Sequence, residues 1–106
     1  AFAQSPDPPL MARAGQAAAD YARELLGENG RAVLVLAGPG NNGGDGFVVA
    51  THLRQGFYRV DVVFAGDDPA KLPRDAAQAY AKWCAVDGRL LQSIPAGARY
   101  DLVIDG

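Results

Sequence analysis

The chain has 106 residues, of which 49% are apolar, so it suits one small globular domain that buries roughly two thirds of its unfolded surface. A net charge of -2 argues against nucleic acid or an anionic membrane as partner, and no apolar run approaches the ~20 residues that cross a bilayer, so we expect a cytoplasmic protein. The single cysteine, Cys84, excludes an internal disulfide and a multi-cysteine metal site.

The first predicted element is a helix over residues 10–26, because apolar residues recur there at spacings of three and four. These positions are Leu10, Met11, Ala14, Ala17, Ala18, Tyr21, Ala22, Leu25 and Leu26. Gly27 is a suitable stop for this helix. Two roles stay open for it: the helix covers a sheet, or it packs against a second subunit in a homo-oligomer.

An apolar run over residues 31–38, "RAVLVLAG", predicts a strand covered on both faces, as in a parallel sheet. A glycine-rich loop follows, and we expect the next helix to run from Gly46 to Gly56. Residues 58–66 predict a second strand. In the helix over residues 46–56, His52 is assigned a structural or half-exposed role because no partner is spaced for catalysis.

A third helix is predicted after residue 72, with Pro73 in its first turn. Its buried face comprises Ala76, Ala79, Tyr80 and Trp83, and Cys84 is expected to be a buried apolar side chain. Residues 89–94 are either a short strand or a loop, and residues 100–106 form a last strand. We therefore predict one domain over residues 1–106 with an α/β fold: a Rossmann-like three-layer α/β/α arrangement on a mainly parallel sheet, incomplete at its C-terminal end.

The order of these elements also predicts where a ligand would bind. Open parallel sheets bind ligands beyond the carboxyl ends of their strands, at the point where the strand order reverses. If the last strand lies beside the first, Asp105 comes close to the glycine-rich loop at residues 38–46. We therefore expect a site that consists of this loop and Asp105.

The loop itself, "GPGNNGGDG", has five glycines, two asparagines and one aspartate in nine positions. The unpaired N–H groups at a helix N-terminus receive phosphate, and glycines let a ligand approach the backbone. Asp45 is either the helix N-cap, which the capping preference favours, or a carboxylate that faces the ligand. The alternative for the whole loop is a tight turn without a ligand, although a bare turn seldom needs all these residues.

Three ligand-binding loops compete for this stretch. Gly38, Gly40 and Gly43 satisfy the dinucleotide pattern G-x-G-x-x-G, whereas a nucleoside-triphosphate loop fits poorly because no Lys-Ser or Lys-Thr follows. A loop that serves a phosphate and a cation together fits the composition better. Amide and carboxylate oxygens are the ligands that alkali and alkaline-earth ions prefer.

The stretch "GPGNNGGDGFVVA" resembles the signature of NAD(P)H-hydrate epimerases, the YjeF N-terminal domain family. Its N-N-G-G-D-G core is contiguous and leads directly into a helix, which is more specific than a glycine fingerprint. "LMARAGQAAA" is similar to the family's first helix, and "YDLVIDG" is similar to the strand that ends in an aspartate before a second loop. The resemblance extends from about Leu10 to Gly106.

This resemblance implies an isomerase of nicotinamide cofactor repair, which interconverts the R and S forms of hydrated NADH and NADPH. A dehydratase driven by ATP or ADP then restores the S form. In many bacteria both activities share one polypeptide, whose dehydratase half resembles ribokinase, so such proteins are often labelled carbohydrate kinases. By matching position, the hydrated dinucleotide would be bound by Asn41, Asn42, Gly43, Gly44 and Asp45. The implied cofactor is K⁺, with Asn42 and Asp105 as its ligands.

The family's acid–base aspartate belongs to a segment beyond the position of Gly106, so no catalytic residue is assigned, and Asp45 is the only candidate inside the loop. Two other functions are weighed. One is a conventional NAD(P)-binding oxidoreductase domain. The other is a scaffold module of the same fold without catalysis, against which the retained asparagines and aspartate of the loop argue.

Overall fold

The computed structural model describes residues 10–105, with the backbone alone for residues 10–12 and 41–43. The longer elements are helix α1 (Leu10–Leu26), strand β1 (Ala32–Ala37), helix α2 (Asn41–Gln55), strand β2 (Arg59–Phe64) and helix α3 (Arg74–Ala85). A 3₁₀ turn, η1 (Pro69–Lys71), precedes α3, and the short strands β3 (Leu90–Leu91) and β4 (Leu102–Asp105) follow it. None of the helices in residues 10–105 is long and apolar enough to cross a membrane.

The strands form one parallel sheet in the order β3-β2-β1-β4. The chain steps from β1 to β2 and on to β3 in one direction, and β4 then lies on the other side of β1. The strand order therefore reverses between β1 and β4, as the sequence predicted. The α/β fold class and the parallel sheet are confirmed.

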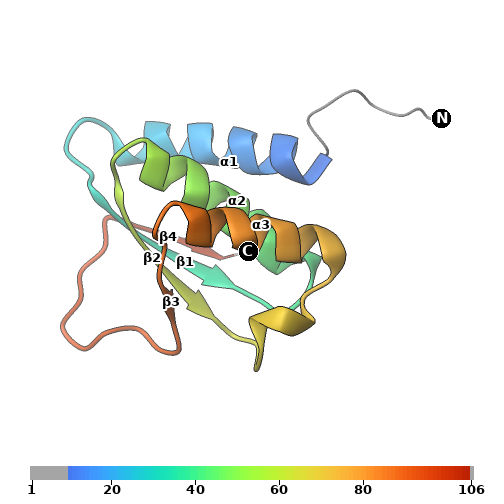
Figure 1. Ribbon diagram of the computed structural model, residues 1–106. Coiled ribbons are helices and arrows are strands. Elements are labelled where there is room, and N and C mark those ends of the chain that lie inside the picture. The colour runs from blue at the N-terminus through green and yellow to red at the C-terminus, as the bar shows by residue number, and fades with distance from the viewer. Residues whose placement is uncertain (1–9, 106) are drawn as a thin grey trace.

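All the helices of residues 10–105 lie on one face of the sheet, as Figure 1 shows. Successive right-handed crossovers that step in the same direction place their helices, α2 and α3, on the same face. Helix α1 packs against α2 and so extends this layer. The connection from β3 to β4, residues 92–101, contains no helix. These residues therefore form two layers, and the helical layer predicted for the second face is not formed by them.

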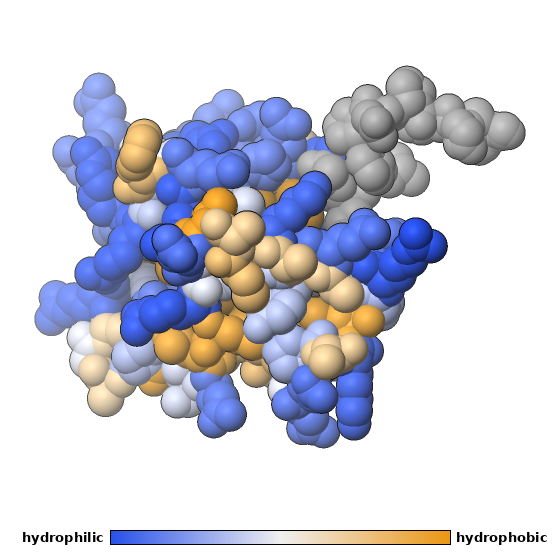
Figure 2. All heavy atoms as spheres, viewed as in Figure 1, coloured by the Kyte–Doolittle hydropathy of each residue, from blue (hydrophilic) through white to orange (hydrophobic). Residues whose placement is uncertain are grey.

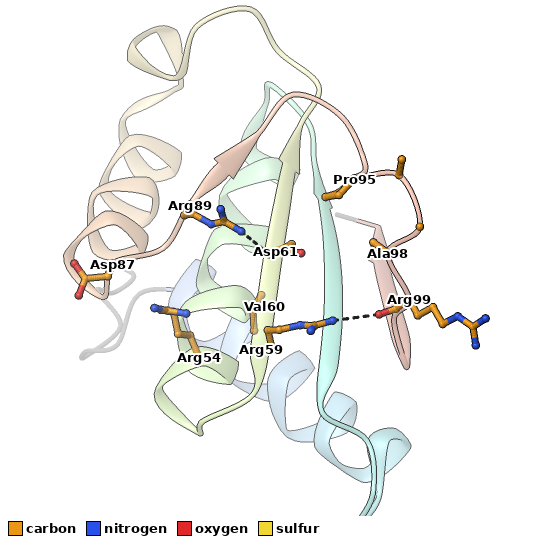
Figure 3. A pocket seen from close by; sticks show the side chains of 11 residues that line it. Arg54, Arg59, Val60, Asp61, Asp87, Arg89, Pro95, Ala98 and Arg99 are labelled. Atoms are coloured by element: carbon orange, nitrogen blue, oxygen red, sulfur yellow. Dashed lines mark hydrogen bonds and ion pairs between the residues drawn. The ribbon is translucent and has the colours of Figure 1, made fainter.

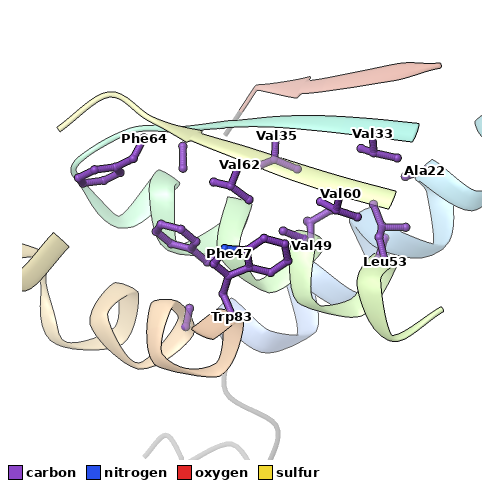
Figure 4. Close-up of a cluster of buried hydrophobic side chains, with 14 of the residues drawn as sticks. Ala22, Val33, Val35, Phe47, Val49, Leu53, Val60, Val62, Phe64 and Trp83 are labelled. Atoms are coloured by element: carbon purple, nitrogen blue, oxygen red, sulfur yellow. The ribbon is translucent and has the colours of Figure 1, made fainter. Parts of the chain in front are cut away.

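Helix α2 occupies the centre of the hydrophobic core (Figure 4). Its Phe47 and Leu53 are fully buried, as is Trp83 of α3. The strands contribute Val33, Val35, Val60 and Val62 to the same cluster. Burying each such side chain contributes about 1.5–3 kcal/mol relative to leaving it exposed, so this interface fixes α2 on the sheet.

The bounds predicted for α1 are confirmed, but the predicted apolar face is only partly right. The buried positions are Gly15, Ala19, Ala22 and Leu26, whereas Tyr21 is 62% and Leu25 is 56% exposed. A stripe of small residues lets α1 approach α2 closely. Figure 2 shows mostly hydrophilic residues over α1 and hydrophobic ones near the middle of the same face.

Candidate functional site

The glycine-rich stretch lies at the carboxyl edge of the sheet and is mostly helical. Strand β1 ends at Ala37, only Gly38–Gly40 form the loop, and α2 begins at Asn41 with Gly40 as its N-cap. The predicted helix start at Gly46 is therefore wrong by five residues. Asp45 lies in the second turn of α2, so the prediction that it caps the helix is also wrong.

Close packing explains why glycines form the start of this helix. A Cβ atom at Gly46 would lie 3.2 Å from Val35 Cγ1 and 3.7 Å from the Cβ atom of Ala37. Gly44 is buried as well. The first turns of α2 therefore lie almost directly on β1. This contact stabilises a helix that the low helix propensity of glycine and asparagine would not form alone.

Strand β4 brings Asp105 to the same edge of the sheet. In the parallel ladder, Asp105 pairs with Leu36, the residue before the end of β1. Asp105 is exposed and Asp45 is half-buried. The strand order and register thus place the end of β4 beside the end of β1, where the glycine-rich stretch begins, as expected. The side chains predicted at Asn41 and Asn42 fall outside the described residues.

The loop after β2 completes this edge of the sheet. The backbone N–H of Ala65 donates to the carbonyl of Ala37 over 2.8 Å, which joins the ends of β2 and β1. A Cβ atom at Gly66 would lie 3.0 Å from Cβ of Pro39, so the two loops are in contact. A cavity of about 130 Å³ adjoins them; its lining is Phe64, Gly66, Asp67, Pro69, Leu90, Leu91 and Gln92.

The electrostatics of the edge suit an anion and leave room for a cation. The first four N–H groups at the start of a helix, here those of Gly40 and residues 41–43, have no partner within the helix, and the dipole is positive at this end. A cation so close to a helix N-terminus needs carboxylates to hold it; Asp45 lies in the second turn of α2 and Asp105 ends β4 at this edge. Within residues 10–105 no three His, Cys, Asp or Glu residues gather as a metal cluster. The donor set, carboxylates with carbonyl oxygens, fits a hard ion such as K⁺.

Two residues outside the edge were given structural roles from the sequence. His52 is half-buried in α2, as expected, and burial, followed by the nearby Arg23 guanidinium, lowers its pKa. Cys84 is exposed, so the expectation of a buried thiol is wrong. It follows Trp83, which takes the buried position on α3.

One feature had no signal in the sequence. At the opposite edge of the sheet, where β2 begins, four arginines are among the residues that line a cavity of about 580 Å³, and the side chain of Arg99 points away from the other three (Figure 3). These arginines come from α2, β2 and two loops, at positions 54, 59, 89 and 99. Because they are far apart in the chain, only the fold brings them together.

The reversal of strand order beside β1, together with a glycine-rich helix start at that point, defines a Rossmann-like α/β domain, a class that binds ligands at the carboxyl edge of the sheet. Comparison with known proteins makes this assignment more specific. Residues 8–106 match the family described as YjeF-related protein N-terminus, and the chain belongs to this family.

Several named relatives are similar to most of the chain. An NAD(P)H-hydrate epimerase of Bordetella pertussis is 53% identical over 97 residues, which cover 92% of this chain and 41% of that protein. One of Achromobacter xylosoxidans is 44% identical, over 92% of this chain and 46% of its own length. A bifunctional NAD(P)H-hydrate repair enzyme of Leishmania major is 38% identical, over 92% of this chain and 18% of its own.

A solved structure supports the fold. The yeast protein YNL200c superposes with a TM-score of 0.66 at 28% identity, over 79% of this chain and 37% of that protein. The chain thus spans less than half of the length of each of these relatives.

Proposed function

We propose that this chain forms part of an NAD(P)H-hydrate epimerase, which interconverts the R and S forms of hydrated NADH and NADPH. The observation that carries the proposal is the meeting of the "NNGGDG" helix start with Asp105 at one sheet edge. That edge is where Rossmann-like domains bind nucleotides. The names of the relatives in Bordetella and Achromobacter support the same activity.

In this proposal the phosphates of the hydrated dinucleotide bind at the start of α2. Residues Asn41, Asn42 and Gly43 offer backbone N–H groups that have no partner in the helix, and Gly44 would contact the substrate beside them. Asp45, one residue further on, would contact a neighbouring group of the substrate. Its carboxylate would repel a phosphate, so it faces a hydroxyl group or a cation instead.

We further propose K⁺ as the bound cofactor, with Asn42 and Asp105 as ligands. The ion would offset the negative charge of the substrate phosphates beside Asp45 and Asp105. Its chemistry is electrostatic: it holds the phosphates and the two strand ends in a fixed arrangement. No acid–base residue is assigned to this stretch.

The proposed partner is an ADP- or ATP-dependent NAD(P)H-hydrate dehydratase in the cytoplasm, either separate or on the same polypeptide. The bifunctional repair enzymes among the relatives support a fused arrangement. The dehydratase would consume the S form that the epimerase produces.

An epimerase assay on the full-length protein that contains this stretch tests the proposal. The R hydrate of NADPH is supplied with an S-specific dehydratase in excess, and recovery of NADPH absorbance is followed with and without K⁺. We expect a rate well above spontaneous epimerisation. Asp105→Ala and Asn42→Ala should each reduce this rate about tenfold or more and weaken its dependence on K⁺.

Asp87→Asn is the matched control, because Asp87 is an exposed carboxylate at the opposite edge of the sheet. A folded protein that gives no acceleration would overturn the enzyme assignment. Tight binding of oxidised NAD without any effect of K⁺ would instead favour an oxidoreductase domain. A rate that is unchanged in Asp105→Ala would remove the proposed K⁺ site but not the activity.

A further inference from the structure

The arginine-lined cavity of about 580 Å³ lies where β2 begins, so it is separate from the proposed epimerase site. Strand β2 has six residues and spans about 20 Å, at about 3.3 Å per residue. The cavity lies at the beginning of this strand, and the glycine-rich stretch lies near its end. One ligand at the carboxyl edge therefore does not account for both.

The cavity carries a surplus of positive charge. Its lining includes four arginines, Arg54, Arg59, Arg89 and Arg99, against two aspartates, Asp61 and Asp87. The guanidinium of Arg99 points away from the others in Figure 3, so three arginines face two aspartates and one positive charge is left over. A surplus of one sign of charge raises the local concentration of the opposite ion, so the arginines of this cavity favour anions.

The internal contacts of these residues leave most guanidinium donors free. Arg54 donates through Nε to the carbonyl of Val86 over 2.6 Å, which is a structural role at the end of α3. Arg59 makes a long hydrogen bond of 3.4 Å to the carbonyl of Arg99. Arg89 is 3.8 Å from Asp61, and its side chain is 75% exposed. Each guanidinium has five N–H donors, so Arg59 and Arg89 retain most of theirs.

The carboxylates do not neutralise the cavity. Asp61 is only 16% exposed and accepts a 2.8 Å hydrogen bond from the hydroxyl of Tyr100, so it is already engaged. Among residues 10–105, the pair of Arg89 with Asp61 is the one ion pair within 4 Å at this cavity. Figure 3 shows Arg89 reaching toward Asp61 and Arg59 reaching toward the backbone of Arg99.

We propose that this cavity binds the phosphate group of a small phosphorylated molecule. Guanidinium groups match the geometry of phosphate oxygens and bind them through paired hydrogen bonds. The volume lies within the range of sites for small organic ligands and exceeds what one phosphate fills. Val60, Pro95 and Ala98 provide apolar lining for the rest of the molecule.

The test uses the full-length protein and two probes, inorganic pyrophosphate and adenosine 5′-monophosphate, at constant ionic strength. Binding is followed by NMR of the arginine Nε–Hε signals, which separates this cavity from the glycine-rich site. We expect the signals of Arg59 and Arg89 to titrate together with each probe. Arg59→Gln and Arg89→Gln should each weaken binding about tenfold or more.

Arg31→Gln is the matched control, because Arg31 is exposed at the same sheet edge but does not line the cavity. Adenosine, which lacks the phosphate, should not bind. An equal loss in Arg31→Gln would show general surface attraction and overturn the proposal, as would the absence of saturation in the wild-type protein. All three arginines are exposed, and circular dichroism verifies that the variants fold. The epimerase assay is independent of this result.

Discussion

Gly15 is the residue at which the packing of α1 on α2 is most sensitive to one added methyl group. A Cβ atom there would lie 2.5 Å from Cβ of Val48, whereas carbon atoms in contact are about 3.5–4.0 Å apart. The helices would have to separate by about 1 Å. Val48 Cβ is fixed by the backbone, so a change of side-chain rotamer cannot remove this contact.

We therefore expect Gly15→Ala to destabilise the protein. Overpacking costs about 1–3 kcal/mol. Alanine recovers about 0.5–1 kcal/mol relative to glycine because it is the better helix former. The net loss in the free energy of unfolding is about 1–2 kcal/mol. Urea denaturation of the full-length protein measures it as a lower midpoint at unchanged slope.

Two variants isolate the cause. Ala17→Gly changes an exposed position of the same helix and reports helix propensity alone. In a double-mutant cycle, Val48→Ala removes the branched side chain that Gly15→Ala meets, so the pair should cost less than the sum of the single changes. If Gly15→Ala is as stable as the wild type or more stable, the close approach of α1 and α2 is not what requires glycine.

Three further changes have defined outcomes. Phe57 has φ of 71°, a conformation that costs a residue with a side chain about 1 kcal/mol, and it is 94% exposed. Phe57→Gly should therefore raise the free energy of unfolding by about 1 kcal/mol in urea denaturation. A lower free energy of unfolding would show that the ring makes stabilising contacts. The backbone N–H groups of Arg31 and Ala32 donate to Asp101 and lower its pKa from 3.8. The carboxylate of Asp101 therefore stabilises the fold above pH 3.8, and this contribution is lost as the pH falls through the lowered pKa. In Asp101→Asn the unfolding midpoint should depend less on pH in the acid range, and an unchanged dependence would contradict this. Burial and the charge of Arg23 lower the pKa of His52 from 6.5, so the free energy of unfolding should fall as the pH drops below 6.5. His52→Gln should remove this dependence on pH. An NMR titration midpoint of His52 at or above 6.5 would refute the shift.

The sheet and its topology were predictable because strand signals are local and the handedness of crossovers is fixed. The apolar run that forms β1 and the order of the following elements predicted a parallel sheet, with β4 beside β1 as the condition for bringing Asp105 near the loop. The pairing of Leu36 with Asp105 confirms that placement. The spacing of three and four residues within α3 likewise identified Ala76, Ala79 and Trp83 as buried, whereas Tyr80 of the same predicted face is half-buried.

Features that depend on distant packing were not predictable. The spacing of apolar residues in α1 predicted one face that included Tyr21 and Leu25, but the fold buries an adjacent stripe with Gly15 and Ala19. The small residues are the ones buried because α2 packs closely against them. The arginines of the second cavity are separated by up to 45 positions, from 54 to 99, and no local pattern joins them.

The start of α2 changes the interpretation of the candidate site. If residues 41–45 formed a loop, their N–H groups could point in several directions. Because they form the first turns of a helix, four N–H groups point along one axis toward the carboxyl edge of the sheet. That arrangement favours a phosphate and disfavours a cation. A K⁺ ion at this edge would therefore depend on the carboxylate of Asp105, its proposed ligand, and its affinity should fall more steeply than that of the phosphate when Asp105 is neutralised.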